Sequence, residues 1–212
     1  MNIFKSVLLI TLVSVSLGSG FAAEVLASAP SHDYAAWATA NPDGSWTRTA
    51  EQAVAATQLY TVVPDDIQQF CPSYAALPQQ QRKQFWVGLL SAMAKPESNF
   101  RPQTSYQERF FDRQGKPVIS RGLLQISIES ANQQRYNCQI AEPKKLHDPK
   151  INLRCGAKIL ALWVKTDGII AQPEDAKTPI GGGRYWSTLR ASRGHLDDIA
   201  AFTRQLPFCE MS

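Results

Sequence analysis

The sequence has few of the side chains that bind metals and cofactors. It contains three histidines and four cysteines among 212 residues, and the cysteines lack the paired short intervals of a zinc site. His32, His147 and His195 form no convincing catalytic pair with a cysteine, so we expect surface or local hydrogen-bonding roles for them. No glycine-rich phosphate loop follows an expected strand. We therefore expect neither a metal nor a cofactor.

The sequence also lacks the features of nucleic-acid-binding and membrane-spanning proteins. No basic stripe with interleaved aromatic residues is present. No apolar run after the N-terminal segment is long enough to cross a bilayer. The formal net charge of +4 is ordinary for a secreted protein and would favour an acidic polymer as a binding partner. We expect neither nucleic acid nor membrane as a partner of the mature chain.

The N-terminal segment, residues 1–27, has the pattern of a secretory signal peptide. One lysine precedes an apolar core, and small residues lead to an expected cleavage site after Ala27. No cysteine follows that would carry a lipid anchor, so we expect a periplasmic or secreted mature protein. Residues 28–64 then indicate an irregular and helical N-terminal extension, and residues 65–212 are enough for one domain with its own core.

The four cysteines form an even set, which is typical of disulfides in an oxidising compartment. Three pairings are open. We favour Cys138 with Cys155, which bracket one short loop, and Cys71 with Cys209, which lie before the core and at the end of the chain. In an ideal chain-entropy model, these two closures stabilise the fold by about 3 and about 5 kcal/mol.

Glu97 is the leading candidate for a catalytic residue. Counting back in helical steps gives Met93, Leu90 and Trp86, so the carboxylate lies on the buried edge of an apolar helix face if the helix reaches it. Burial would raise its pKa and suit it to general acid catalysis near neutral pH. Pro96 is unfavourable inside a helix and predicts a kink or an end just before Glu97. An isolated glutamate at a helix end more often makes only a local hydrogen bond.

Three sequence blocks follow one another in an informative order. The first is Glu97-Ser98, the second is Gly-Leu-Leu-Gln-Ile at residues 122–126, and the third is Asn152 followed four residues later by glycine and then by an apolar pair. The ordered set resembles the lysozyme-like lytic transglycosylases, specifically the domain of the soluble lytic murein transglycosylases. The resemblance implies a mainly α, lysozyme-like α+β domain that binds glycan strands in a groove.

The resemblance also implies which side chains act on the substrate. It makes Glu97 the catalytic acid and places further residues at the glycan, namely Ser98, Leu124, Gln125 and Asn152. The amide of Gln125 has the donors and the acceptor that sugar N-acetyl and hydroxyl groups need, although a buried amide with local partners is the common alternative. Asn152 lies at helical spacing from a glycine and a leucine, a pattern that favours packing over substrate contact.

The sequence departs from the family at two places. The family motif Ala-Tyr-Asn-Ala-Gly, whose tyrosine lies close to the catalytic glutamate, is absent. Tyr185, which follows the glycines at 181–183, is the candidate replacement, and a core aromatic is the alternative. The stretch between the first two blocks is also longer, and its turn at residues 113–116 predicts a short β-hairpin next to the groove.

Two classes of function are consistent with these residues. By resemblance, the protein is an enzyme that cleaves the β-1,4 bond between N-acetylmuramic acid and N-acetylglucosamine in peptidoglycan and leaves 1,6-anhydromuramic ends. If Glu108 or Asp112 serves as a second carboxylate, the protein would be a hydrolysing muramidase instead. Loss of turnover would leave a glycan-binding or assembly module, which the missing tyrosine motif favours. The sequence does not identify a secretion-system or envelope partner.

Overall fold

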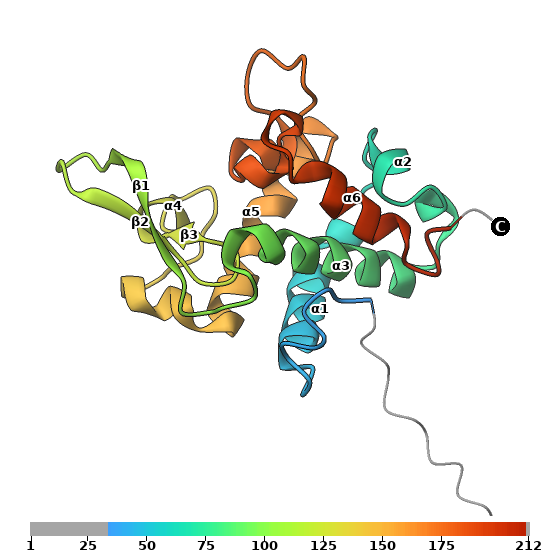
Figure 1. The fold of residues 1–212 in the computed structure, drawn as a ribbon, viewed down its shortest axis with the longest axis horizontal. Coiled ribbons are helices and arrows are strands. Elements are labelled where there is room, and N and C mark those ends of the chain that lie inside the picture. Colours follow the sequence, from blue (N-terminus) through green and yellow to red (C-terminus); the bar gives the residue numbers. More distant parts are fainter. Residues whose placement is uncertain (1–33, 211–212) are drawn as a thin grey trace, which may run out of the picture. The chain divides into compact units, whose positions relative to one another are not determined.

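The computed structural model describes residues 34–210, so the expected signal peptide at residues 1–27 lies outside the described part of the chain. The described residues form helices and one small antiparallel sheet (Figure 1), and this confirms the expected mainly α, lysozyme-like α+β fold. In chain order the helices and strands are α1 (Ser45–Thr57), α2 (Ile67–Phe70), α3 (Gln79–Ser98), β1 (Ser105–Phe111), β2 (Pro117–Arg121), β3 (Ile126–Ser127), α4 (Ile128–Ala131), α5 (Pro149–Asp167) and α6 (Leu196–Arg204). Short 3-10 helices connect them.

The N-terminal extension is packed against the rest of the domain from Tyr34 onward. The described residues all belong to one compact unit, within which α1 packs against α3 and α5. Trp37 and Leu59, which flank α1, are fully buried in the common core. The extension therefore contributes to the same hydrophobic core as the helix that carries Glu97.

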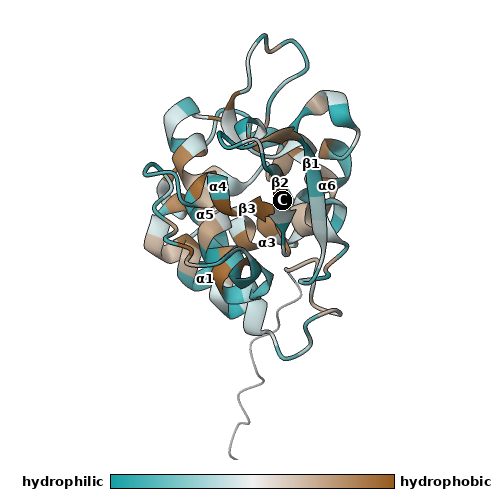
Figure 2. Cartoon of the chain, turned by 90° about the vertical axis from the view of Figure 1, so that its left-hand side faces the viewer, coloured by the Kyte–Doolittle hydropathy of each residue, from teal (hydrophilic) through white to brown (hydrophobic). Residues whose placement is uncertain are grey.

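Helix α3 lies at the centre of the core. Every residue from Phe85 to Ala94 is buried, which is typical of a helix that other elements surround. Helices α1 and α6 pack against α3 (Figure 1). Hydropathy colouring shows the same division, with hydrophobic colour on β3 and parts of α3 and hydrophilic colour over much of β1 (Figure 2).

Of the two alternatives expected at Pro96, a kink or an end of the helix, the end is wrong. The helix runs through Pro96 to Ser98 and ends at Asn99, which has a left-handed backbone with φ of 50°. Proline removes one backbone hydrogen bond from a helix interior. Here the preceding buried turns hold the helix in the core, and the break comes only three residues later. Glu97 therefore still belongs to the helix and keeps its register with the buried face.

The expected β-hairpin is present as β1 and β2, which pair antiparallel, and β3 continues the sheet beside β2. The turn is stabilised by Asp112, whose Oδ1 accepts hydrogen bonds of 2.8 Å from the backbone N–H groups of Gln114 and Lys116. Gly115 has φ of 75°, a conformation that suits glycine in a turn. The carboxylate of Asp112 is thus used by the turn itself.

The second and third sequence blocks meet in one joint between the loop after β2 and helix α5. Asn152 accepts a hydrogen bond of 2.8 Å from the Leu124 N–H and donates to the carbonyls of Arg121 and Leu146. A Cβ on Gly156 would lie 2.3 Å from Leu124 Cδ1, so any larger residue would force the Leu124 side chain to move. The joint fixes the loop that carries Gln125.

Two disulfides close the chain at the pairing favoured from the sequence. Cys71 is bonded to Cys209, which ties the end of α2 to the residues after α6. Cys138 is bonded to Cys155, which ties the loop after α4 to α5.

Among the described helices, none combines the length and the apolar character needed to cross a membrane.

Candidate active site

The candidate active site is a groove of about 610 Å³ between the end of α3, the hairpin, and the segment that precedes α6. Polar side chains make up much of its wall, as expected of a surface that binds sugars. Its lining includes Glu97, Glu108, Phe110, Ser120, Gln125, Ser127, Ser130, Gln133, Arg135, Tyr136, Trp163, Arg184, Tyr185, Trp186 and Arg190.

Glu97 lies in the wall of this groove, partly buried in the last turn of α3. Its Oε1 accepts a hydrogen bond of 2.7 Å from the Thr188 hydroxyl. Burial is the main cause that raises the pKa of Glu97, to about 7; the hydrogen bond from Thr188 lowers it and the charge of Glu108 raises it. A carboxyl group with this pKa holds a proton in a substantial share of molecules at neutral pH.

The chain leaves α3 through two successive residues with left-handed backbone, Asn99 with φ of 50° and Phe100 with φ of 59°. Asparagine tolerates this conformation, whereas an aromatic residue adopts it at a cost in free energy. Such strain often accompanies functional sites. In this chain the two left-handed residues turn the backbone sharply after Ser98. Glu97 therefore lies in the last turn of α3, where the helix meets the groove.

Glu108 is the second carboxylate in the groove. It comes from β1, and its Oε1 accepts a hydrogen bond of 2.6 Å from the Ser120 hydroxyl of β2. The hairpin therefore forms one wall of the groove and presents an acid to it. Of the two second carboxylates considered from the sequence, Glu108 lines the groove and Asp112 holds the hairpin turn.

Gln125 lines the groove from the joint with α5. Its backbone has φ of 45°, and its Nε2 donates to the carbonyls of Gly122 at 2.8 Å and Thr104 at 3.2 Å. Within the described residues, its buried Oε1 has no hydrogen-bond partner. Both amide hydrogens are thus engaged by backbone carbonyls, which hold the side chain in the wall of the groove.

Tyr185 also lines the groove, and its hydroxyl accepts a long hydrogen bond of 3.4 Å from the Ser127 N–H. Burial raises the pKa of Tyr185 well above its usual range, and the charge of Glu97 contributes in the same direction, which places the phenol within electrostatic reach of the acid. The hydroxyl that hydrogen-bonds to Glu97 in the described chain is that of Thr188.

Ser98, Leu124 and Asn152 do not reach the groove. The Ser98 hydroxyl donates to the Ala94 carbonyl within α3, Leu124 is fully buried, and the polar atoms of Asn152 are all bonded to backbone groups. These three residues stabilise the helix and the loop that carry Glu97 and Gln125. Of the predicted site residues, Glu97, Gln125 and Tyr185 line the groove. Thr188 was not predicted, because a single threonine far along the chain belongs to no motif.

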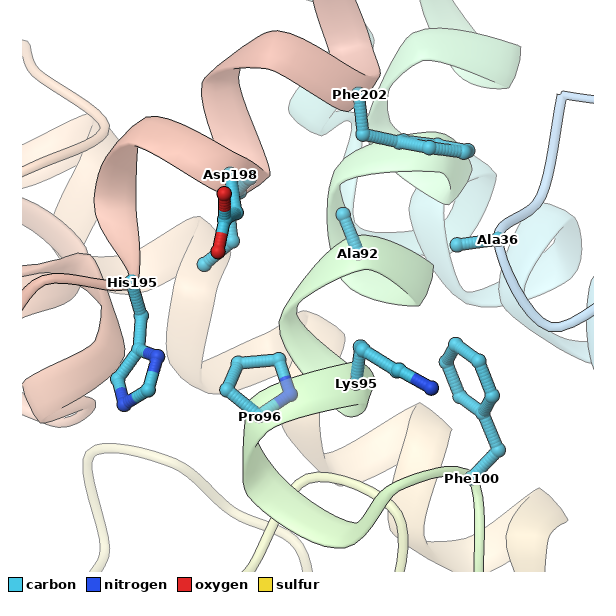
Figure 3. Close-up of a pocket in the computed structure, with 9 residues that line it drawn as sticks. Ala36, Ala92, Lys95, Pro96, Phe100, His195, Asp198 and Phe202 are labelled. Carbon is cyan, nitrogen blue, oxygen red and sulfur yellow. The ribbon is translucent and has the colours of Figure 1, made fainter.

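A second cavity of about 540 Å³ lies on another side of α3. Pro96 lines this cavity while its neighbour Glu97 lines the groove, so the last turn of α3 contributes to both. Figure 3 shows Lys95 beside Phe100, and His195 and Asp198 on the α6 side. The lining of this second cavity is mainly apolar.

Within the described part of the chain, no group of three or more His, Cys, Asp or Glu side chains could hold a metal ion.

Comparisons with known proteins agree with this geometry. The model of the family described as Transglycosylase SLT domain matches residues 75–168. A solved structure of Bd0314 DslA with one glutamate replaced by glutamine is 42% identical over 84% of this chain and 98% of that chain, with a TM-score of 0.78. Wild-type Bd0314 DslA is 44% identical over 78% and 91% of the two chains, with a TM-score of 0.73. Among curated proteins, none matches the chain.

Proposed function

Because the chain belongs to the Transglycosylase SLT domain family, we propose that it is a peptidoglycan lytic transglycosylase. It cleaves the β-1,4 bond between N-acetylmuramic acid and N-acetylglucosamine. The observation that carries the proposal is Glu97, a groove carboxyl group whose pKa is raised to about 7 mainly by burial. A glycosidic oxygen is a poor leaving group unless it is protonated, and Glu97 is the group in this groove best suited to protonate it.

In this mechanism Glu97 acts twice. It first gives its proton to the glycosidic oxygen as the bond from that oxygen to the anomeric carbon of the muramyl residue breaks. The resulting carboxylate then takes the proton of the muramyl 6-hydroxyl, whose oxygen bonds to the anomeric carbon and closes the 1,6-anhydro ring. Thr188 holds Oε1 by its 2.7 Å hydrogen bond in both steps, and it stabilises the charged form between them.

A hydrolysing muramidase is the second candidate, and Glu108 is the observation that favours it. Hydrolysis by paired carboxylates needs a second acid across the bond, as nucleophile or as base for water. Glu108 lines the same groove and its charge acts on Glu97. In Bd0314 DslA, two mutants replace glutamates separated by the same number of positions as Glu97 and Glu108. The shared spacing draws attention to the same pair in this chain.

Digestion of purified peptidoglycan by wild type, Glu97→Gln and Glu108→Gln tests the proposal. Mass spectrometry of the products separates the candidates. Anhydromuramic ends support a lytic transglycosylase, reducing muramic ends support a muramidase, and intact sacculi with wild-type protein would support a glycan-binding module. Under the favoured proposal, Glu97→Gln gives no products, whereas Glu108→Gln still gives anhydro ends. Under the second, both variants lose most of their activity.

The location of the protein follows from the same proposal. Peptidoglycan lies outside the cytoplasm, and two disulfides suit an oxidising compartment. We retain residues 1–27 as the expected signal peptide for export, with the mature chain periplasmic or secreted. Its substrate there is the glycan strand of peptidoglycan.

A further inference from the structure

One part of the groove wall is basic. Arg135, Arg184 and Arg190 all line it, against the two carboxyl groups of Glu97 and Glu108. The sugar chain itself carries no charge where its lactyl groups are in amide linkage to the peptide stems. The three arginines therefore exceed what recognition of the sugars requires, and they favour a ligand with negative groups beside the sugar chain.

Two of these arginines keep an uncompensated charge. Arg184 forms an ion pair with Asp167, through Nε at 2.6 Å and Nη2 at 2.9 Å. Arg135 donates from Nε to the amide oxygen of Gln133 at 2.8 Å, and Arg190 donates from Nε to the Gly183 carbonyl at 2.8 Å. These last two acceptors are neutral, and no carboxylate pairs with either arginine among the described residues. Each guanidinium thus retains free donors for an anion.

Arg135 is held in place before any ligand binds. Its guanidinium carbon lies 5.4 Å from the centroid of the Trp163 ring, and that of Arg184 lies 4.7 Å from the same ring. Trp163 is itself fixed by a 3.0 Å hydrogen bond from Nε1 to the Tyr136 hydroxyl. Cation–π contacts and hydrogen bonds of this kind reduce the ordering that binding must impose on a flexible side chain.

We propose that Arg135 and Arg190 bind carboxylates of the peptide stem that is attached to N-acetylmuramic acid. The inference rests on the proposed function, because it assigns a peptide-bearing substrate to the same groove. Guanidinium groups bind carboxylates through paired, charge-assisted hydrogen bonds. The protein therefore prefers glycan strands that still carry their stems, and the preference weakens at high salt because exposed charges are screened.

The test compares stem-bearing glycan with the same material after its peptide amino groups are blocked and its carboxylates are converted to amides. We expect amidation to lower wild-type turnover by about tenfold, the effect of losing one charge-assisted contact. In Arg135→Gln/Arg190→Gln, amidation should make little difference. Arg135→Lys/Arg190→Lys keeps the charge and should retain part of the preference. The charge-matched control Arg193→Gln/Arg204→Gln changes exposed arginines outside the groove and should behave as wild type.

A full preference in the Arg135→Gln/Arg190→Gln variant, or the same loss in the control, would overturn the inference. Glycan stripped of stems by an amidase keeps a free lactyl carboxylate, and an equal preference for it would assign the arginines to that group instead. Sedimentation of the Glu97→Gln protein with amidated and unmodified sacculi measures the same contact without turnover. If wild-type protein cleaves nothing, the proposed function fails while this binding comparison still decides the role of the arginines.

Discussion

The Thr188 hydroxyl donates a 2.7 Å hydrogen bond to Oε1 of Glu97, although the two residues lie 91 positions apart. Thr188 is buried in a 3-10 helix (Ser187–Leu189) that packs against α3. The bond therefore joins the central helix to the segment that precedes α6, and it fixes one oxygen of the acid.

Replacing Glu97 by glutamine should abolish cleavage of peptidoglycan and leave the fold intact. The amide keeps the shape of the side chain but has no proton to transfer. Product release from sacculi, read beside the melting temperature, measures both effects. A variant that keeps most of its turnover would remove Glu97 from the mechanism.

Replacing Thr188 by valine should shift the pH dependence of the reaction. The hydrogen bond lowers the pKa of Glu97, so its loss raises that pKa further and moves the alkaline limb of the activity profile to higher pH. Loss of orientation should also reduce turnover, by about tenfold. Thr188→Ser keeps the hydroxyl and should restore both properties. An unshifted limb in Thr188→Val would show that the bond does not act on the acid.

Glu97 should make the stability of wild-type protein depend on pH. Its pKa is about 7 in the folded protein, against 4.5 for an exposed glutamate. The protonated acid suits its buried site, so this contribution is complete below about pH 4.5 and is lost as the pH rises through about 7, a difference of a few kcal/mol. Glu97→Gln does not titrate there. The free energy of unfolding, measured with urea, should therefore fall for wild type relative to Glu97→Gln as the pH rises from 4.5 to 8. If the two proteins show the same dependence on pH, the raised pKa of Glu97 is contradicted.

Tyr185 offers a comparison between hydroxyl and ring. Its hydroxyl accepts a 3.4 Å bond from the Ser127 N–H and also interacts with the Ser130 side chain. Its ring packs 4.7 Å from Trp186 and 6.0 Å from Tyr136, measured between centroids. We expect Tyr185→Phe to reduce turnover less than Thr188→Val does. Tyr185→Ala should lower the free energy of unfolding by about 3 kcal/mol through the cavity that it leaves. A Phe variant as impaired as Glu97→Gln would instead assign the phenol a direct catalytic role.

The disulfides should differ in their contribution to stability. The Cys71–Cys209 bond closes a far longer loop than Cys138–Cys155, with sequence separations of 138 and 17. Chain entropy predicts that Cys71→Ser/Cys209→Ser costs about 5 kcal/mol and Cys138→Ser/Cys155→Ser about 3 kcal/mol. Denatured wild-type protein exported to an oxidising compartment should show no free thiol. The opposite order of the two double variants would show that strain or residual structure outweighs loop length.

Local patterns in the sequence predict much of the fold. The helical spacing of Trp86, Leu90 and Met93 predicted the apolar face of α3, and the turn at residues 113–116 predicted the hairpin. These signals are local, so one sequence can show them. The helix does not end at Pro96, because burial of the preceding turns outweighs the local free-energy cost of proline in a helix. That burial is a property of the whole core, so the local sequence does not show it.

The candidate site could be predicted only in part. Glu97 and Gln125 belong to motifs, and both line the groove. Thr188 reaches Glu97, and Arg135 reaches the groove, only through the arrangement of distant segments, and neither residue belongs to a sequence motif. Asn152 belongs to a motif yet lies behind the groove, bonded to backbone groups. Helical spacing had favoured packing for Asn152, and the structure agrees with that physical reading.

The joint between Asn152, Leu124 and Gly156 has a consequence for identifying related enzymes. Two of the three blocks that mark the family meet there, and both serve to lock a loop onto α5. A relative that preserves them preserves the scaffold, whatever reaction it performs. Its activity is better judged from the residues that correspond to Glu97, at the end of α3, and to Thr188, which lies outside all three blocks. A sequence comparison that gives all three blocks the same weight would group chains that keep Glu97 with chains that keep only the scaffold.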